Sequence, residues 1–181
     1  MALTPSNMLP LGTIAPNFEL INTNDNKPFL FQNVENKTAY CIFFICNHCP
    51  YVKYVKNQLI ALYQDYHAKN IAFIAINSND FVAYPEDNPE KMKAENYPFP
   101  YLIDESQQVA KLYDAACTPD LYIFDKEKKL VYRGQLDDAR PGNQQPNDGK
   151  DVRNAFDEIL KGNSPTKFQK PSVGCNIKWK K

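Results

Sequence analysis

Two cysteines in the stretch FFICNHCPYVK are the residues of this chain best suited to chemistry. Cys46 and Cys49 are separated by two residues, a spacing at which one thiol can attack a partner disulfide and the other can resolve the mixed disulfide. His48 lies between them as a possible cation or hydrogen-bond donor that favours a thiolate. Pro50 follows directly, and proline is common at the first position of a helix. The pattern predicts a thiol–disulfide exchange site.

The cysteine pair lies where a predicted strand meets a predicted helix. Residues 38–45 form an apolar, β-branched and aromatic run that is typical of a strand buried on both faces. In residues 50–67 apolar side chains recur at intervals of three and four, which predicts a helix with one buried face. The first N–H groups of that helix and its dipole would stabilise a thiolate at Cys46, the expected nucleophile. Cys49 is expected one turn into the helix, as the more sheltered resolving thiol.

The remaining elements predict an α/β arrangement. A second buried strand over residues 71–77 would pair in parallel with the first and complete a right-handed βαβ unit. The other expected elements are a hairpin in 18–32, a helix from 89 to about 96, a strand in 101–104, a helix in 105–116, a hairpin in 120–134 and a helix in 149–162. The inward-facing residues of the last two helices are expected to be Val109, Leu112 and Tyr113, and Val152, Phe156, Ile159 and Leu160. We expect one domain over residues 1–181, with 163–181 as an extended C-terminal tail.

Composition narrows the possible functions. The 181 residues suit one domain, and 21 lysines and arginines balance 21 aspartates and glutamates. We therefore expect neither nucleic acid nor a membrane surface as a partner. No apolar run approaches the about 20 residues of a membrane span, and the N-terminus lacks the features of a secretory signal, which predicts a cytoplasmic protein. Five cysteines in a domain of this size favour thiol chemistry over a disulfide scaffold.

Several motifs carry a family resemblance. The segments GTIAPNFEL, CNHCPYVK, AINSND, CTPDLYIFD and PSVGCNIKWK together resemble a peroxiredoxin-like family in the redoxin (AhpC/TSA-like) branch of the thioredoxin superfamily. The resemblance covers nearly the whole chain. It implies a thioredoxin fold, a central mixed sheet flanked by helices, with a redoxin-type N-terminal hairpin and a C-terminal tail. It also implies that Cys46 and Cys49 are the redox pair, and that Thr118 and a cis Pro119 face them where a bound polypeptide would pair.

Two positions depart from the thioredoxin pattern. Ile45 replaces the tryptophan that commonly precedes the first cysteine, and Tyr40 stands where thioredoxin has a buried acidic proton acceptor. The resemblance therefore does not indicate how Cys49 loses its proton.

A peroxiredoxin-type thiol peroxidase is the first alternative. If Cys49 were the peroxidatic cysteine, Cys46 would replace the threonine or serine that lies three positions earlier, and Ile42 would replace the proline. Such a site also needs a positioned arginine, and no motif places the three arginines of the chain, Arg133, Arg140 and Arg153. The expected function is thus a thiol–disulfide oxidoreductase acting on a protein disulfide or a small thiol, with peroxide as the alternative substrate.

The second alternative is a non-enzymatic module that binds a metal or senses redox state through Cys46, His48 and Cys49. Structural zinc needs four ligands, and the sequence offers no second cysteine pair at zinc spacing, so we expect neither a metal nor another cofactor. Cys117 and Cys175 are candidates for additional redox thiols. The sequence does not predict the oligomeric state.

Overall fold

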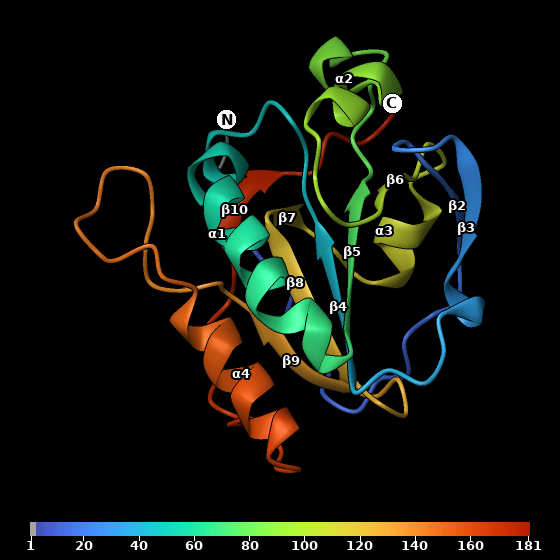
Figure 1. The fold of residues 1–181 in the computed structure, drawn as a ribbon. Helices are drawn as coiled ribbons and strands as arrows, with labels where there is room; N and C mark the ends of the chain where they lie inside the picture. The colour runs from blue at the N-terminus through green and yellow to red at the C-terminus, as the bar shows by residue number, and fades with distance from the viewer. Residues whose placement is uncertain (1–2) are drawn as a thin grey trace.

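A computed structural model describes residues 3–181 of the chain. Seven strands form the central sheet, in the order β3-β2-β6-β5-β4-β8-β9, and three form a second sheet, β1-β10-β7 (Figure 1). The strands are β1 (Leu3–Pro5), β2 (Glu19–Asn22), β3 (Lys27–Leu30), β4 (Ala39–Phe44), β5 (Ile71–Asn77), β6 (Tyr101–Ile103), β7 (Cys117–Thr118), β8 (Asp120–Asp125), β9 (Leu130–Gly134) and β10 (Val173–Asn176). The helices are α1 (Pro50–Tyr66), α2 (Pro89–Ala94), α3 (Gln108–Leu112) and α4 (Lys150–Leu160), with the 3-10 turns η1 (Phe31–Asn33), η2 (His67–Lys69) and η3 (Pro85–Asp87).

The centre of the sheet is the predicted βαβ unit. Strands β4 and β5 pair in parallel from Ala39 opposite Ile71 to Phe44 opposite Ile76, and α1 connects them. On its other side β4 pairs antiparallel with β8, so every residue of β4 is buried. The expected hairpins are also present, because β2 pairs with β3 and β8 with β9. The sheet is therefore mixed, as expected.

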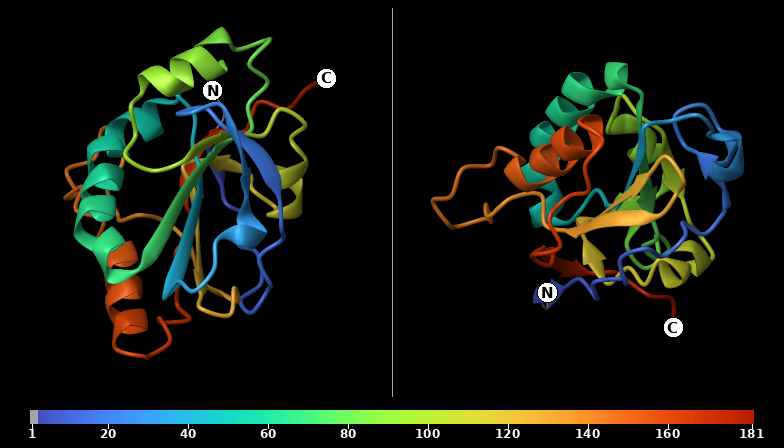
Figure 2. Two further views of the ribbon diagram at one scale, coloured as in Figure 1. Left: turned by 45° about the vertical axis from the view of Figure 1, so that its right-hand side comes forward. Right: turned by 90° about the horizontal axis from the view of Figure 1, so that it is seen from below.

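Helices cover both faces of the sheet. Helices α1 and α4 pack on one face and α3 on the other (Figure 2). Successive residues of β4 point to opposite faces. Cys41 and Phe43 therefore join the core beneath α1 and α4, whereas Tyr40 and Phe44 join the core on the α3 side.

Two predicted inward-facing residues are exposed. Leu112 is 56% exposed, since the buried stripe of α3 runs through Val109, Ala110 and Tyr113 and leaves Leu112 about 100° away around the helix. Leu160 is 37% exposed because it is the last residue of α4 and lies at the edge of the stripe formed by Val152 and Phe156. The predictions for these two leucines are wrong.

The C-terminal segment is more than an extended tail. Within residues 163–181, β10 pairs with β1 along one edge and with β7 along the other. The first and last strands of the chain therefore lie side by side (Figure 2). A Cβ atom on Gly174 would lie 2.0 Å from the carbonyl oxygen of Thr118, so only glycine permits this approach. Gly174 thus allows β10 to pack directly against Thr118 and Pro119. Within residues 3–181, no helix is both long and apolar enough to cross a membrane.

Candidate functional site

The cysteine pair occupies the turn between β4 and α1. Cys49 is the N-cap of α1, with Pro50 at the first helical position, so the prediction that Cys49 lies one turn into the helix is wrong. The reason is local, because a proline disfavours helical backbone angles in the residue before it. Cys49 accordingly has extended angles, φ −66° and ψ 123°. Cys49, rather than Cys46, is the cysteine at the start of the helix.

Thr118 contacts both sulfurs. The Thr118–Pro119 peptide bond is cis, and the Sγ atom of Cys46 lies 3.5 Å from the Thr118 hydroxyl oxygen. The Sγ atom of Cys49 lies 3.2 Å from the Thr118 carbonyl oxygen, which accepts a hydrogen bond when Cys49 is a thiol. Both cysteines are buried, with 1% and 0% of their surface exposed. The two predicted site segments therefore meet.

The two sulfurs titrate as one pair. The interaction with the Cys46 thiol lowers the pKa of Cys49 to about 4, against the opposing effect of burial. The interaction with Cys49, together with burial and the nearby charge of Asp87, raises the pKa of Cys46. The Thr118 hydroxyl and carbonyl groups, one beside each sulfur, are polar groups in contact with this pair.

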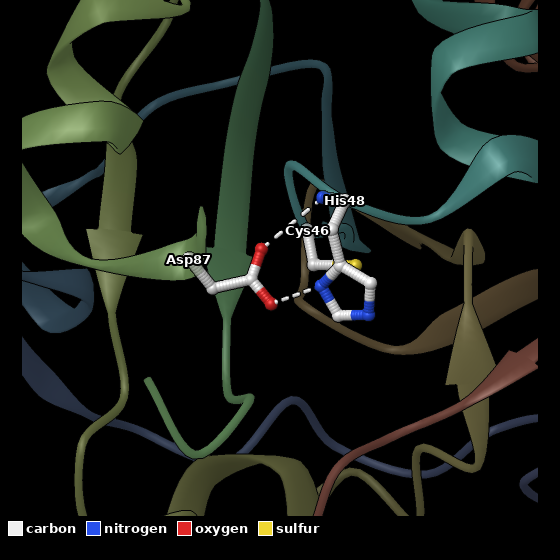
Figure 3. Close-up of side chains that lie close together, drawn as sticks. All are labelled: Cys46, His48 and Asp87. Atoms are coloured by element: carbon white, nitrogen blue, oxygen red, sulfur yellow. Dashed lines mark hydrogen bonds and ion pairs between the residues drawn. The ribbon is translucent and has the colours of Figure 1, made fainter. Parts of the chain in front are cut away.

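A buried carboxylate orients His48 (Figure 3). Nδ1 of His48 lies 2.6 Å from Oδ2 of Asp87, which also accepts a hydrogen bond from Nδ2 of Asn79 at 2.8 Å. The other oxygen, Oδ1, accepts from the backbone N–H groups of Asn47 and His48. Burial tends to raise the pKa of Asp87, but the hydrogen bonds from His48 and Asn79 outweigh it and lower that pKa. Because an ionised carboxylate only accepts hydrogen bonds, Nδ1 of His48 is the donor.

Sequence reasoning missed Asp87. The segment YPEDNP predicted only the helix that begins at residue 89, which Asn88 caps by accepting the N–H of Lys91 at 2.9 Å. Nothing in the spacing connects Asp87 to a histidine 39 residues earlier.

Cys46, His48 and Asp87 form a group that could hold a metal ion. One possible ligand atom from each lies within 4.8 Å of the others, and Cys49 is not part of this group. In the structure, however, Nδ1 of His48 and both carboxylate oxygens of Asp87 already make hydrogen bonds. A metal ion would have to replace them.

A family model for the AhpC/TSA family matches residues 11–133, about two thirds of the chain. The chain belongs to the AhpC/TSA family. A comparison with curated proteins gave no match.

Solved structures show the same fold. An uncharacterized conserved protein from Geobacillus kaustophilus is 54% identical over 99% of this chain and 97% of its own, with a TM-score of 0.97. A hypothetical protein from Sinorhizobium meliloti 1021 is 45% identical over 98% of both chains, with a TM-score of 0.95. The thioredoxin domain of a thiol-disulfide oxidoreductase from Bacteroides vulgatus is 15% identical over 80% of this chain and 96% of its own, with a TM-score of 0.61. This AhpC/TSA-family chain therefore has a thioredoxin fold.

The other cysteines of this family member occupy three different environments. Cys41 lies within β4, where burial raises its pKa. Cys117 is also buried, and its Sγ lies 3.6 Å from the carbonyl oxygen of Pro119. Cys175 lies opposite Thr118, the residue that contacts both sulfurs of the pair. The structure thus brings Cys175 to the pair, whereas Cys41 lies inside β4.

The arginines of this family member bind elsewhere. The guanidinium of Arg133 contacts the carbonyl of Leu9 and the side chain of Gln169. Arg140 binds Gln135 and nearby carbonyl groups, and Arg153 binds Asp65. Each guanidinium therefore hydrogen-bonds groups other than the two cysteines, and Arg140 also lines the hollow beside Pro119.

Proposed function

We propose that this protein is a thiol–disulfide oxidoreductase that uses Cys46 and Cys49 as its redox pair. The observation that carries the proposal is the geometry of the pair, because both sulfurs lie within 3.5 Å of an oxygen of Thr118, directly before the cis Pro119. The lowered pKa of Cys49 adds that the pair can hold a thiolate at neutral pH. The family and the fold support an oxidoreductase of the thioredoxin-like kind. A small, open hollow lined by Tyr51, Arg140 and Val173 adjoins Pro119 at the surface beside the cis proline.

The reaction begins with a proton transfer inside the pair. Cys46 passes its proton to the Cys49 thiolate, and the new Cys49 thiol donates to the Thr118 carbonyl oxygen. The Cys46 thiolate then attacks one sulfur of a partner disulfide R–S–S–R′. The partner S–S bond breaks, a Cys46–S–S–R bond forms, and R′S⁻ takes the proton from Cys49.

Resolution completes the exchange. The Cys49 thiolate attacks the sulfur of Cys46, so that the Cys46–Cys49 disulfide forms and RS⁻ leaves. The partner disulfide gains two electrons and the cysteine pair loses two. Cys49 therefore acts first as the base and then as the resolving nucleophile. In this mechanism Cys49 loses its proton to the departing R′S⁻, so no buried acid is needed at the position where this chain has Tyr40.

His48 has a supporting role in this mechanism. With Nδ1 donating to Asp87, the ring keeps Nε2 for proton exchange. Its nearer nitrogen lies within 4.8 Å of the Cys46 sulfur, close enough for a protonated ring to stabilise a thiolate there. Asp87 is the positioning residue of this arrangement, because it sets the tautomer and orientation of His48.

Trapping with oxidised glutathione tests the assignment. We expect the Cys49→Ser variant to accumulate a glutathione adduct on Cys46, since its resolving thiol is absent, and the Cys46→Ser variant to lose exchange. Mass spectrometry of alkylated peptides measures both outcomes. Cys41→Ala is the control, because Cys41 is a buried thiol of the preceding strand, and it should exchange like the wild type. Exchange by Cys46→Ser, together with no adduct on Cys49→Ser, would show that the roles are wrong.

A thiol peroxidase is the second candidate, because Cys49 lies at a helix N-cap with its pKa lowered to about 4. In that reaction the Cys49 thiolate would attack hydrogen peroxide, release hydroxide and become a sulfenic acid. The hydrogen bonds that engage the three guanidinium groups with other residues argue against it. Catalytic consumption of dilute peroxide that is lost in Cys49→Ser and kept in Cys46→Ser would favour the peroxidase over the exchange mechanism.

A further inference from the structure

The strand β10 brings a third thiol to the pair. In the register of β10 and β7, Cys175 lies opposite Thr118 and Asn176 lies opposite Cys117. Side chains of directly opposed residues lie on the same face of a sheet, and the next residues point to the other face. Cys175 therefore shares a face with the Thr118 side chain, which contacts Cys46, whereas Cys117 points the opposite way.

The register of β10 and the shared buried cluster place Cys175 beside Cys49. A hydrogen bond between the two thiol groups helps to lower the pKa of Cys49, and burial followed by that hydrogen bond raises the pKa of Cys175 to about 12. Cys175 is 4% exposed, and its strand is held by β1 on one edge and by β7 on the other. The absence of a side chain on Gly174 holds β10 against the carbonyl group of Thr118. The third thiol is thus buried in place beside the pair.

We propose that Cys175 is a third redox thiol, which takes over the oxidation of the pair as a Cys49–Cys175 disulfide. This inference rests on the proposed function, because the Cys46–Cys49 disulfide is its starting material. The Cys175 sulfur attacks the sulfur of Cys49, the Cys46–Cys49 bond breaks, and a Cys49–Cys175 bond forms. The proton of Cys175 passes to Cys46, which leaves as a thiol. No external oxidant or reductant takes part, since the exchange moves one disulfide within the protein.

The exchange has a functional consequence. It regenerates a reduced Cys46, the attacking residue, while the protein still carries two oxidising equivalents. It also covalently joins the C-terminal strand, which already pairs with β7, to the start of α1. The reduced Cys46 on the His48 side then remains to react with a small thiol or disulfide.

Alkylation of the oxidised protein tests the relay. The wild-type protein is oxidised, the Cys46–Cys49 disulfide is confirmed by peptide mapping, and iodoacetamide is added without reductant. We expect alkylated Cys46 to accumulate together with a Cys49–Cys175 crosslinked peptide, because alkylation traps each Cys46 thiol that the exchange releases. In Cys175→Ser, alkylation of Cys46 should be slower by about tenfold or more, and the crosslink should be absent.

The control is Cys117→Ala, which removes a buried thiol from the opposite face of the same strand pair and should react like the wild type. If oxidised wild-type protein forms the Cys46–Cys49 disulfide but neither alkylates at Cys46 nor yields the crosslink, the relay is wrong and the proposed function stands. If the Cys46–Cys49 disulfide does not form at all, the proposed function itself fails. The wild-type map decides between these outcomes even if Cys175→Ser does not fold.

Discussion

At the scale of single residues, Pro50 decides where α1 begins. It excludes Cys49 from the helix and makes it the N-cap, where the interaction with the Cys46 thiol lowers the pKa of Cys49. Cys46 lies three residues before the cap, near the negative charge of Asp87, which helps to raise its pKa. A proline directly after the second cysteine therefore sets the geometry of the pair.

The thiolate has a predictable pH dependence. Because the folded-state pKa of Cys49 is about 4, the thiolate absorbance of the reduced protein should stay constant from about pH 8 to about pH 6 and fall as the pH approaches that pKa. In Cys46→Ala the hydrogen-bond donor is gone, so the pKa should rise and the absorbance should fall at higher pH. An ultraviolet titration measures both, with Cys41→Ala as the matched control. A wild-type titration with an ordinary thiol pKa would contradict the coupling of the two sulfurs.

At the scale of elements, Asp87 connects η3 to the turn that holds the cysteine pair. Its fully buried carboxylate accepts hydrogen bonds from the backbone N–H of Asn47, the ring of His48 and the side-chain amide of Asn79. The amide of Asn47 is held in turn by the hydroxyl of Tyr101 through Oδ1 at 2.9 Å. Three segments that are distant in sequence therefore fix the conformation of one turn.

Replacing this carboxylate should destabilise the protein. Asp87→Asn puts an amide donor against the donors of His48 or Asn79, so the free energy of unfolding at neutral pH should fall by about 1–3 kcal/mol. The folded-state pKa of Asp87 is lowered, so its stabilisation is present above the unfolded-state pKa and is lost as the pH falls through the folded-state pKa. The difference between wild type and variant should therefore shrink in acid.

Urea unfolding at neutral and acidic pH measures this effect. Asp65→Asn serves as the control, because that carboxylate is exposed and pairs with Arg153 at the surface, where an ion pair contributes little. A pH-independent difference for Asp87→Asn would show that the substitution acts through packing and not through the charge.

At the scale of the whole molecule, two cores on opposite faces of the sheet support the site. Phe156 of α4 packs against the rings of Tyr66 and Phe73, with centroid distances of 5.0 Å and 5.6 Å, and thereby attaches α4 to α1 and β5. These residues lie toward the end of α1 that is remote from Cys49. The stability of the fold and the chemistry of the pair can therefore be changed separately.

Phe156→Ala separates the two. Removing a fully buried phenylalanine should lower the free energy of unfolding by about 3–5 kcal/mol, through lost contacts and the cavity that remains. The pKa of Cys49 in the folded variant should stay where it is in the wild type. Phe168→Ala is the matched control, because that ring is 96% exposed and its removal should change stability little. Thermal unfolding and the thiolate titration measure the two properties, and a shifted thiolate titration would show that they are coupled.

The sequence by itself determined the fold and the place of Cys46 and Cys49 between β4 and α1. Those features rest on local signals: continuous apolar strands, the helical period of α1, and a proline next to the second cysteine. The same signals failed at Leu112 and Leu160, where a short helix or a helix end leaves the apolar stripe ill defined.

Only the tertiary structure decided which distant groups reach the pair. Asp87 meets His48, and Cys175 meets Cys49, through contacts that span 39 and 126 positions of the sequence. The residues around Asp87 and Cys175 carry no period or motif spacing that points to these partners, since a loop and a four-residue strand are positioned by the elements on which they pack. The candidate thiols, Cys175 among them, were visible in the sequence, whereas the orientation of His48 and the place of Cys175 beside the pair follow from the packing of the chain.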